Sequence, residues 1–363
     1  MSPLVLLCDY HRGCIGSGTG PGCKVAKFAP APMNSRLLLP FRLLLLTGLA
    51  SVAAAGPVRL TKLDDRVRVE IEGRLFTEYI FGDSAGRPYC YPILAADGTS
   101  LTRDFPMKTT PGEETDHPWH RPVTFTHLDV NGVDFWSDEN YTDKAAKPKG
   151  RTIHDGFVET SDGDVGVITT RNRWVASDGR LICTDRRTLL FHASPAGRFL
   201  DFEITIHALP DQPLIFGDTK DGTMAFRVAQ WMTLPHKYQS KDVPGQGHYL
   251  TSTGLRDAAA WGQRAAWCDL SAPHDGKVYG ISFFDHPQNL RHPTWWMARD
   301  YGLFAANPFG QHDFEGRKDQ PTLGNHTVPA GGSLTMRYRF YFHEGDPETA
   351  KVADHYAAYV AGK

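Results

Sequence analysis

The chain has few cysteines, and their number and spacing exclude a disulfide-rich scaffold and a cysteine-based zinc or redox motif. Of the six cysteines in 363 residues, only Cys90, Cys183 and Cys268 follow the first 55 residues. Three cysteines form at most one disulfide, and these lack the close spacing of a zinc or redox motif. The fold must therefore rest on its apolar core, and about 300 residues suffice for one large β domain or two smaller ones.

An excess of basic residues is also absent. Residues 1–55 hold five of the 39 Lys and Arg residues and one of the 41 Asp and Glu residues, so residues 56–363 carry 34 bases against 40 acids, a formal net charge of −6. A nucleic-acid-binding protein needs a basic surface to neutralise phosphates. The composition therefore argues against a nucleic-acid partner.

No stretch after residue 55 is apolar enough to span a membrane, but a short apolar run precedes it. Arg36 and Arg42 are followed by apolar residues 43–50 and by Ala53-Ala54-Ala55, which is the order of a secretory signal peptide. A transmembrane anchor is the alternative. It is disfavoured because Pro40 and Arg42 interrupt the run well short of the ~20 residues that a span needs.

The N-terminus therefore predicts an exported protein, periplasmic or secreted, with cleavage after Ala55. Residues 1–32 do not fit ahead of a signal peptide, so we interpret them as a misassigned extension before the initiator Met33. We predict a signal peptide over 33–55 and a single domain over 56–363, with no membrane span in the mature protein.

Alternation of apolar and polar residues indicates an antiparallel β protein. In 334–342 the residues Leu334, Met336, Tyr338, Phe340 and Phe342 share one face. Similar period-two patterns occur at 66–71, 164–176, 180–192, 200–207 and 277–284. We predict an all-β fold, a sandwich or a larger two-sheet assembly, with one terminal helix that Asp346 caps.

Polar residues that could carry chemistry gather in three segments. Segment 116–136 begins as a loop and continues as a strand from Pro122; segment 216–228 holds a turn between two strands; segment 283–314 is predicted as a long excursion from the sheet. Segments 142–150 and 236–248 are predicted as surface loops. We expect residues from at least two of the three polar segments to meet in one cleft.

Several kinds of site are absent from these segments. There is no GxSxG, no phosphate loop and no dinucleotide fingerprint. His117, His120 and His127 could bind a divalent metal, but their spacing is not that of a helical zinc motif. What remains suits a carbohydrate: histidines for proton transfer, Arg, Asp and Asn for hydroxyls, and aromatic faces for stacking on a pyranose.

The segments resemble a bacterial family called PmoA-like, whose name is borrowed from a methane mono-oxygenase subunit. The resemblance covers most of residues 58–350 and is carried by HPWHRP, HLDVNGVDFW, FGDTKDG and DHPQNLRHPTWWMARDYGLFAANPFG. Trp119 and Pro122 depart from the family pattern at the first motif. The resemblance implies a galactose-mutarotase-like β-supersandwich and an association with sugar metabolism.

We predict an exported enzyme that uses histidine and carboxylate acid–base chemistry on a sugar or an oxidised glycoside, as a lyase, hydrolase or epimerase. The predicted catalytic residues are His120, His127 and Asp218. The predicted substrate-binding residues are His117, Arg121, Asp129, Asn131, Lys220, His286, Arg291, His292, Trp295, Asp300, Asn307 and His312. The expected partner is a carbohydrate small molecule or oligosaccharide.

Two alternatives stay open. One is a non-catalytic glycan-binding protein of the cell envelope, which would share the aromatic and arginine content. The other is a metal-dependent enzyme with a histidine-rich site. No cofactor is certain from the sequence.

Overall fold

A computed structural model describes residues 29, 56–83, 86–137, 147–236 and 240–362. All helices and strands below belong to one compact unit, residues 53–363. Apart from Ala29, the predicted extension (1–32) and signal peptide (33–55) lie outside the described residues. No helix in the described ranges is long and apolar enough to cross a membrane.

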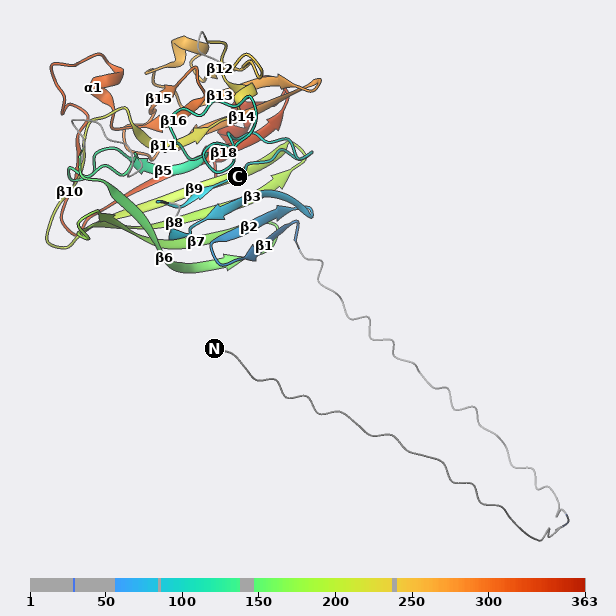
Figure 1. Ribbon diagram of the computed structural model, residues 1–363, viewed down its shortest axis with the longest axis horizontal. Coiled ribbons are helices and arrows are strands. Elements are labelled where there is room, and N and C mark those ends of the chain that lie inside the picture. Colours follow the sequence, from blue (N-terminus) through green and yellow to red (C-terminus); the bar gives the residue numbers. More distant parts are fainter. Residues whose placement is uncertain (1–28, 30–55, 84–85, 138–146, 237–239, 363) are drawn as a thin grey trace, which may run out of the picture. The chain divides into compact units, whose positions relative to one another are not determined.

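Within these ranges the strands form two eight-stranded antiparallel sheets and one small sheet (Figure 1). In spatial order, the first sheet contains β1 (Val58–Lys62), β2 (Arg66–Ile71), β3 (Arg74–Ile80), β4 (Tyr89–Cys90), β5 (Val123–His127), β11 (Gly222–Arg227), β16 (Leu303–Asn307) and β15 (Trp295–Ala298). The second contains β12 (His248–Thr251), β13 (Trp267–His274), β14 (Lys277–Asp285), β18 (Ser333–Glu344), β9 (Gly197–Ala208), β8 (Leu181–Ser194), β7 (Gly166–Ala176) and β6 (Gly150–Ser161). The small sheet pairs β10 (Leu214–Phe216) with β17 (His326–Val328).

The main core lies between the two large sheets. Phenylalanines of one sheet meet those of the other: the ring centroids of Phe76 and Phe342 are 5.5 Å apart, and those of Phe226 and Phe340 are 5.7 Å apart. Because successive side chains of a strand point to opposite faces, the alternating apolar residues fall on these two inner faces. The prediction of a large antiparallel β-sandwich is confirmed.

Segment 283–314 differs from its prediction as a long loop, because it contains β15 and β16. Both strands are buried on both faces. Their sequences, WWMA and LFAAN, are apolar up to Asn307 and show none of the alternation on which the prediction relied. The two strands form the edge of the first sheet next to β11.

The C-terminal helix is confirmed, but it begins later than predicted. Helix α2 covers Val352–Val360 and packs on the second sheet, where the ring centroids of Phe284 and Tyr356 are 5.6 Å apart. Asp346 caps a turn before the helix, since its Oδ1 accepts a hydrogen bond from the Thr349 amide. The other helical elements in the described ranges are short: η2 (Gln230–Met232), η3 (Asp257–Ala260) and α1 (Gln311–Phe314).

Candidate functional site

A cavity of about 410 Å³ lies on the outer face of the first sheet, away from the main core. In β16, Phe304 faces the main core while Leu303 and Ala305 face a second apolar cluster. Met297 and Trp136 belong to that second cluster and also line the cavity. The outer face of β15 and β16 therefore supports the cavity, which explains why both faces of these strands are apolar.

All three polar segments contribute to the lining of this cavity. The lining residues from segment 116–136 include His117, Trp119 and His120; segment 216–228 gives Lys220 and Asp221; segment 283–314 gives Met297, Arg299 and Tyr301. The expected convergence is thus found, although by partly different residues. Of the predicted site residues, His117, His120 and Lys220 line the cavity.

His117 has the position of a proton-transfer group. It lies on the loop before β5, and its Nδ1 contacts the carboxylate of Asp116. Its ring stacks on Tyr301 at 5.1 Å and on His120 at 4.7 Å between centroids. The side chain is 38% exposed, and no described residue forms a hydrogen bond with its Nε2. One ring nitrogen is thus fixed by a carboxylate while the other is available to a ligand.

Two buried arginines anchor Asp116. Arg103 and Arg227 contact its Oδ1 at 2.8 and 2.7 Å. Burial alone would raise the pKa of the Asp116 carboxyl, but the hydrogen bond with His117 and the charges of Arg227 and Arg103 outweigh burial and hold this pKa below its usual value. Asp116 is therefore ionised and orients the His117 ring.

His120 is buried and neutral. Only 4% of the residue is exposed, and Arg227 Nη1 lies 3.3 Å from its Nδ1. Because a guanidinium can only donate, Nδ1 accepts and the proton of the neutral ring is on Nε2. Burial, followed by the charge of Arg227, lowers the pKa of His120 well below its ordinary value of 6.5. His120 can therefore donate a hydrogen bond at neutral pH but carries no charge.

Other polar side chains of the lining form close ion pairs. Lys149 Nζ lies 2.6 Å from Asp134 Oδ2, and Lys220 Nζ lies 3.3 Å from Asp221 Oδ2. Sequence reasoning named Asp129 and Asp218 and missed Asp134 and Asp221, which lie in the same two segments. Lys149 belongs to a segment predicted as a surface loop, and only the register with Asp134 brings it to the cavity.

His127 does not line the cavity, contrary to its predicted role as a proton-transfer group beside His120. It is completely buried in β5, and its Nε2 is 2.8 Å from the Gly217 carbonyl oxygen. The rings of Phe216 and Phe309 pack on it. A Cβ at Gly222 would lie 2.4 Å from its Nδ1, so glycine is required there. The structure gives His127 a packing position between strand and turn.

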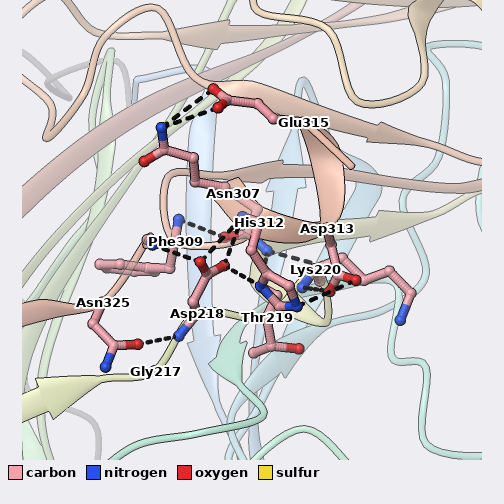
Figure 2. Close-up of polar contacts among 12 residues, drawn as sticks. Gly217, Asp218, Thr219, Lys220, Asn307, Phe309, His312, Asp313, Glu315 and Asn325 are labelled. Carbon is pink, nitrogen blue, oxygen red and sulfur yellow. Dashed lines mark hydrogen bonds and ion pairs between the residues drawn. The ribbon is translucent and has the colours of Figure 1, made fainter. Parts of the chain in front are cut away.

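Asp218 is likewise held inside the protein, not at the cavity. Its carboxylate is 0% exposed and accepts hydrogen bonds from the amides of His312 and Gly324, while His312 Nδ1 lies 2.8 Å from it (Figure 2). Its own amide donates to Asn325 Oδ1. The predicted base thus connects the turn after β10 to the segment that follows β16.

Arg291 and Asn307 strengthen the same region. The guanidinium of Arg291 donates to the carbonyls of Pro308 and Gly324 at 2.8 and 2.7 Å. Asn307 is fully buried, and its Nδ2 donates to the carbonyls of Thr219 and Lys220, both at 2.9 Å. We call Asp218, Arg291, Asn307 and His312 the latch cluster. The side chains of Asp218, Arg291 and Asn307 form hydrogen bonds with main-chain atoms of neighbouring loops and so hold these loops in place. Asn307 in this way positions the turn that carries Lys220.

The remaining predicted residues also lie off the cavity lining. Asp129 pairs with Lys147, Asn131 donates to Pro213, Arg121 donates to Pro118, and His292 pairs with Asp285. Trp295 packs under Arg264, His286 against Tyr359, and Asp300 is exposed beside the Tyr301 amide. Within the described ranges, no three His, Cys, Asp or Glu side chains are grouped so that they could hold a metal ion.

A family model matches residues 66–357. The chain belongs to the family of unknown function DUF6807. The PmoA-like name that the motifs predict is not confirmed by this match and stays a prediction. Comparison with curated proteins gives no match for this DUF6807 chain.

Several solved structures are similar to this DUF6807 protein. A galactose mutarotase-like protein from Lactobacillus casei has 11% identity and a TM-score of 0.34, covering 79% of this chain and 100% of that one. A galactose mutarotase related enzyme from Lactobacillus acidophilus has 9% identity and a TM-score of 0.34, covering 79% and 97%. A polysaccharide lyase has 13% identity and a TM-score of 0.33, covering 81% of this chain, which spans only 33% of the lyase.

Proposed function

We propose that this DUF6807 protein is an exported carbohydrate-active enzyme that binds a sugar, or an oxidised glycoside, in the cavity described above. One observation carries the proposal: the His117 imidazole, fixed by a carboxylate on one side, stands among aromatic rings in a single cavity. The cavity volume of about 410 Å³ lies in the range of small-molecule sites.

The lining supplies the contacts that a pyranose needs. Trp119, Trp136 and Tyr301 offer apolar ring surface for the C–H face of a sugar. Asp221 can accept hydrogen bonds from hydroxyls, and Lys149 and Lys220 can donate them. Ligand contacts of both kinds are therefore within one cavity.

His117 is the proposed proton-transfer residue. With Asp116 bound at Nδ1, its Nε2 can take or give a proton at a sugar hydroxyl, a ring oxygen or a carbon next to an oxidised centre. His120 is the proposed donor to a substrate oxygen, because it is neutral and its proton is on Nε2. This pair replaces the sequence-based pair of His120 and His127.

A glycan-binding protein without catalysis is the second candidate, and the aromatic lining favours it equally. The two candidates differ in what His117 does. A catalytic His117 contributes to turnover more than to affinity, whereas a purely binding His117 contributes to affinity alone.

The test compares His117→Ala with His248→Ala. His248 is an exposed histidine that also pairs with a carboxylate, Asp257, at 3.3 Å, but lies outside the cavity lining. Affinity is measured by calorimetry and turnover by product analysis on a panel of methyl glycosides and their 3-keto derivatives. We expect His117→Ala to lower turnover by about 100-fold or more with little change in affinity, and His248→Ala to change neither. Binding without turnover in the unmodified protein would favour the glycan-binding candidate.

A further inference from the structure

The charged residues of the cavity lining are unequal in sign. Among the described lining residues, the cations are Lys147, Lys149, Lys220 and Arg299, and the carboxylates are Asp134 and Asp221. The chain as a whole has a formal net charge of −2. The lining is thus positive in a protein that is slightly negative, and this contrast singles the cavity out electrostatically.

Most of these cations are already balanced. Lys149 pairs with Asp134 and Lys220 with Asp221, as described above. Lys147 Nζ lies 2.9 Å from Asp129 Oδ2. For Arg299, in contrast, no carboxylate or hydrogen-bond acceptor of the described residues contacts the guanidinium, and its Nε is buried without a partner. The unbalanced charge of the lining therefore resides mainly on Arg299.

The surroundings of Arg299 hold it in place without neutralising it. Its guanidinium carbon is 5.2 Å from the Trp261 ring centroid, and its main chain forms a tight turn with Gly302 and Leu303. Behind Tyr301, Arg227 and Arg103 share the single carboxylate of Asp116. The surplus positive charge of these two arginines makes the potential on the Tyr301 side of the cavity more positive. A partly buried guanidinium left unpaired costs free energy, and a ligand anion removes that cost on binding.

We propose that the sugar bound in this cavity carries a carboxylate, as a uronic acid does, and that Arg299 binds that carboxylate. The proposal rests on the proposed function. A planar carboxylate matches the two-donor edge of a guanidinium, and the aromatic rings and hydroxyl-binding pairs of the same lining hold the pyranose. Arg299 is then the residue that separates acidic from neutral sugars.

The experiment measures calorimetric affinity for methyl β-glucuronide and methyl β-galacturonide against the matching methyl glucoside and galactoside. Methyl β-glucoside 6-sulfate is measured as a second anionic sugar. The variants are Arg299→Gln and Arg299→Lys, with Arg186→Gln as the matched control. Arg186 is an exposed arginine of β8 on the second sheet, outside the cavity lining. Circular dichroism and thermal unfolding establish that each variant is folded.

We expect the uronides to bind at least about tenfold more tightly than the neutral glycosides. Arg299→Gln should remove this preference, Arg299→Lys should keep part of it, and Arg186→Gln should keep all of it. Equal affinity for acidic and neutral glycosides would overturn this inference while leaving the proposed function intact. Tight binding of a glucoside 6-sulfate without binding of uronides would also overturn it, and binding of none of these sugars would overturn both.

Discussion

Two clusters of the protein contain the same residue types and use them differently. In the cavity cluster, which comprises Asp116, His117, His120 and Arg227, a histidine contacts an aspartate that arginines support. In the latch cluster, His312 contacts Asp218 at 2.8 Å and Arg291 lies nearby. The sequence predicted one catalytic residue in each cluster, His120 in the cavity cluster and Asp218 in the latch cluster.

What separates the clusters is the partner of each polar atom. In the latch cluster the Asp218 carboxylate accepts hydrogen bonds from main-chain amides, and the Arg291 guanidinium donates to main-chain carbonyls. In the cavity cluster the arginines bind the carboxylate, and the imidazole keeps one nitrogen available. The side chain of His117 is 38% exposed and that of His312 only 16%. Availability of a polar atom, more than residue type, therefore distinguishes a side chain that can contact a ligand from one that stabilises the fold.

The largest expected effect is the loss of folding stability when the latch cluster is disrupted. Asp218→Asn removes a buried charge that accepts two amide hydrogen bonds and pairs with His312, so the free energy of unfolding should fall by about 3 kcal/mol. Chemical denaturation measures this loss. Turnover or sugar affinity of the folded variant should change less than about twofold, because Asp218 lies off the cavity lining. A stable but inactive variant would make Asp218 catalytic after all.

Asn307→Ala tests the connection between the two clusters. The variant loses the amide that holds the Thr219 and Lys220 carbonyls, which should cost about 2 kcal/mol of stability. Because the same turn presents Lys220 and Asp221 to the cavity, sugar affinity should also fall several-fold. Asn131→Ala is the control, since its amide holds a turn away from the lining. Loss of stability with unchanged affinity would show that the clusters are independent.

Tyr301→Ala sharpens the comparison on the cavity side. Removing the ring that stacks on His117 should weaken sugar binding by about 1 kcal/mol, or roughly fivefold, because apolar contact with the pyranose is lost. Tyr301→Phe keeps the ring and should bind almost as the unmodified protein does. Titration calorimetry distinguishes the two, and equal affinity of all three proteins would remove Tyr301 from the site.

The last prediction concerns the pH dependence of stability. Burial lowers the pKa of both His120 and His127 below the value near 6.5 of an unfolded histidine. The folded state therefore binds fewer protons than the unfolded state in acid. Their contribution to stability is complete above about pH 6.5 and is lost as pH falls below it. The unfolding free energy should decrease from pH 7 to pH 5, and less steeply in His120→Gln. An unchanged slope in that variant would contradict a buried, neutral His120.

The fold was predictable because alternation reports directly on which face of a strand is buried. That rule located β2, β9, β14 and β18 closely, and it failed at β15 and β16, where apolar residues face the main core on one side and the cavity support on the other. The three polar segments were predictable as a group. Which residues line the cavity was not, because only their three-dimensional partners show that His127 is enclosed and that His117 faces the cavity. Asp134 and Tyr301 lie within the motifs HLDVNGVDFW and DHPQNLRHPTWWMARDYGLFAANPFG, but nothing in those motifs marked them as lining residues.

A crystal structure of the protein with a bound methyl glycoside tests the central claim most directly. The account predicts a pyranose in the cavity, with a sugar oxygen within hydrogen-bond distance of His117 Nε2 and a ring face on Tyr301 or Trp119. A sugar bound at the latch cluster or on the second sheet, with the cavity empty, would contradict it.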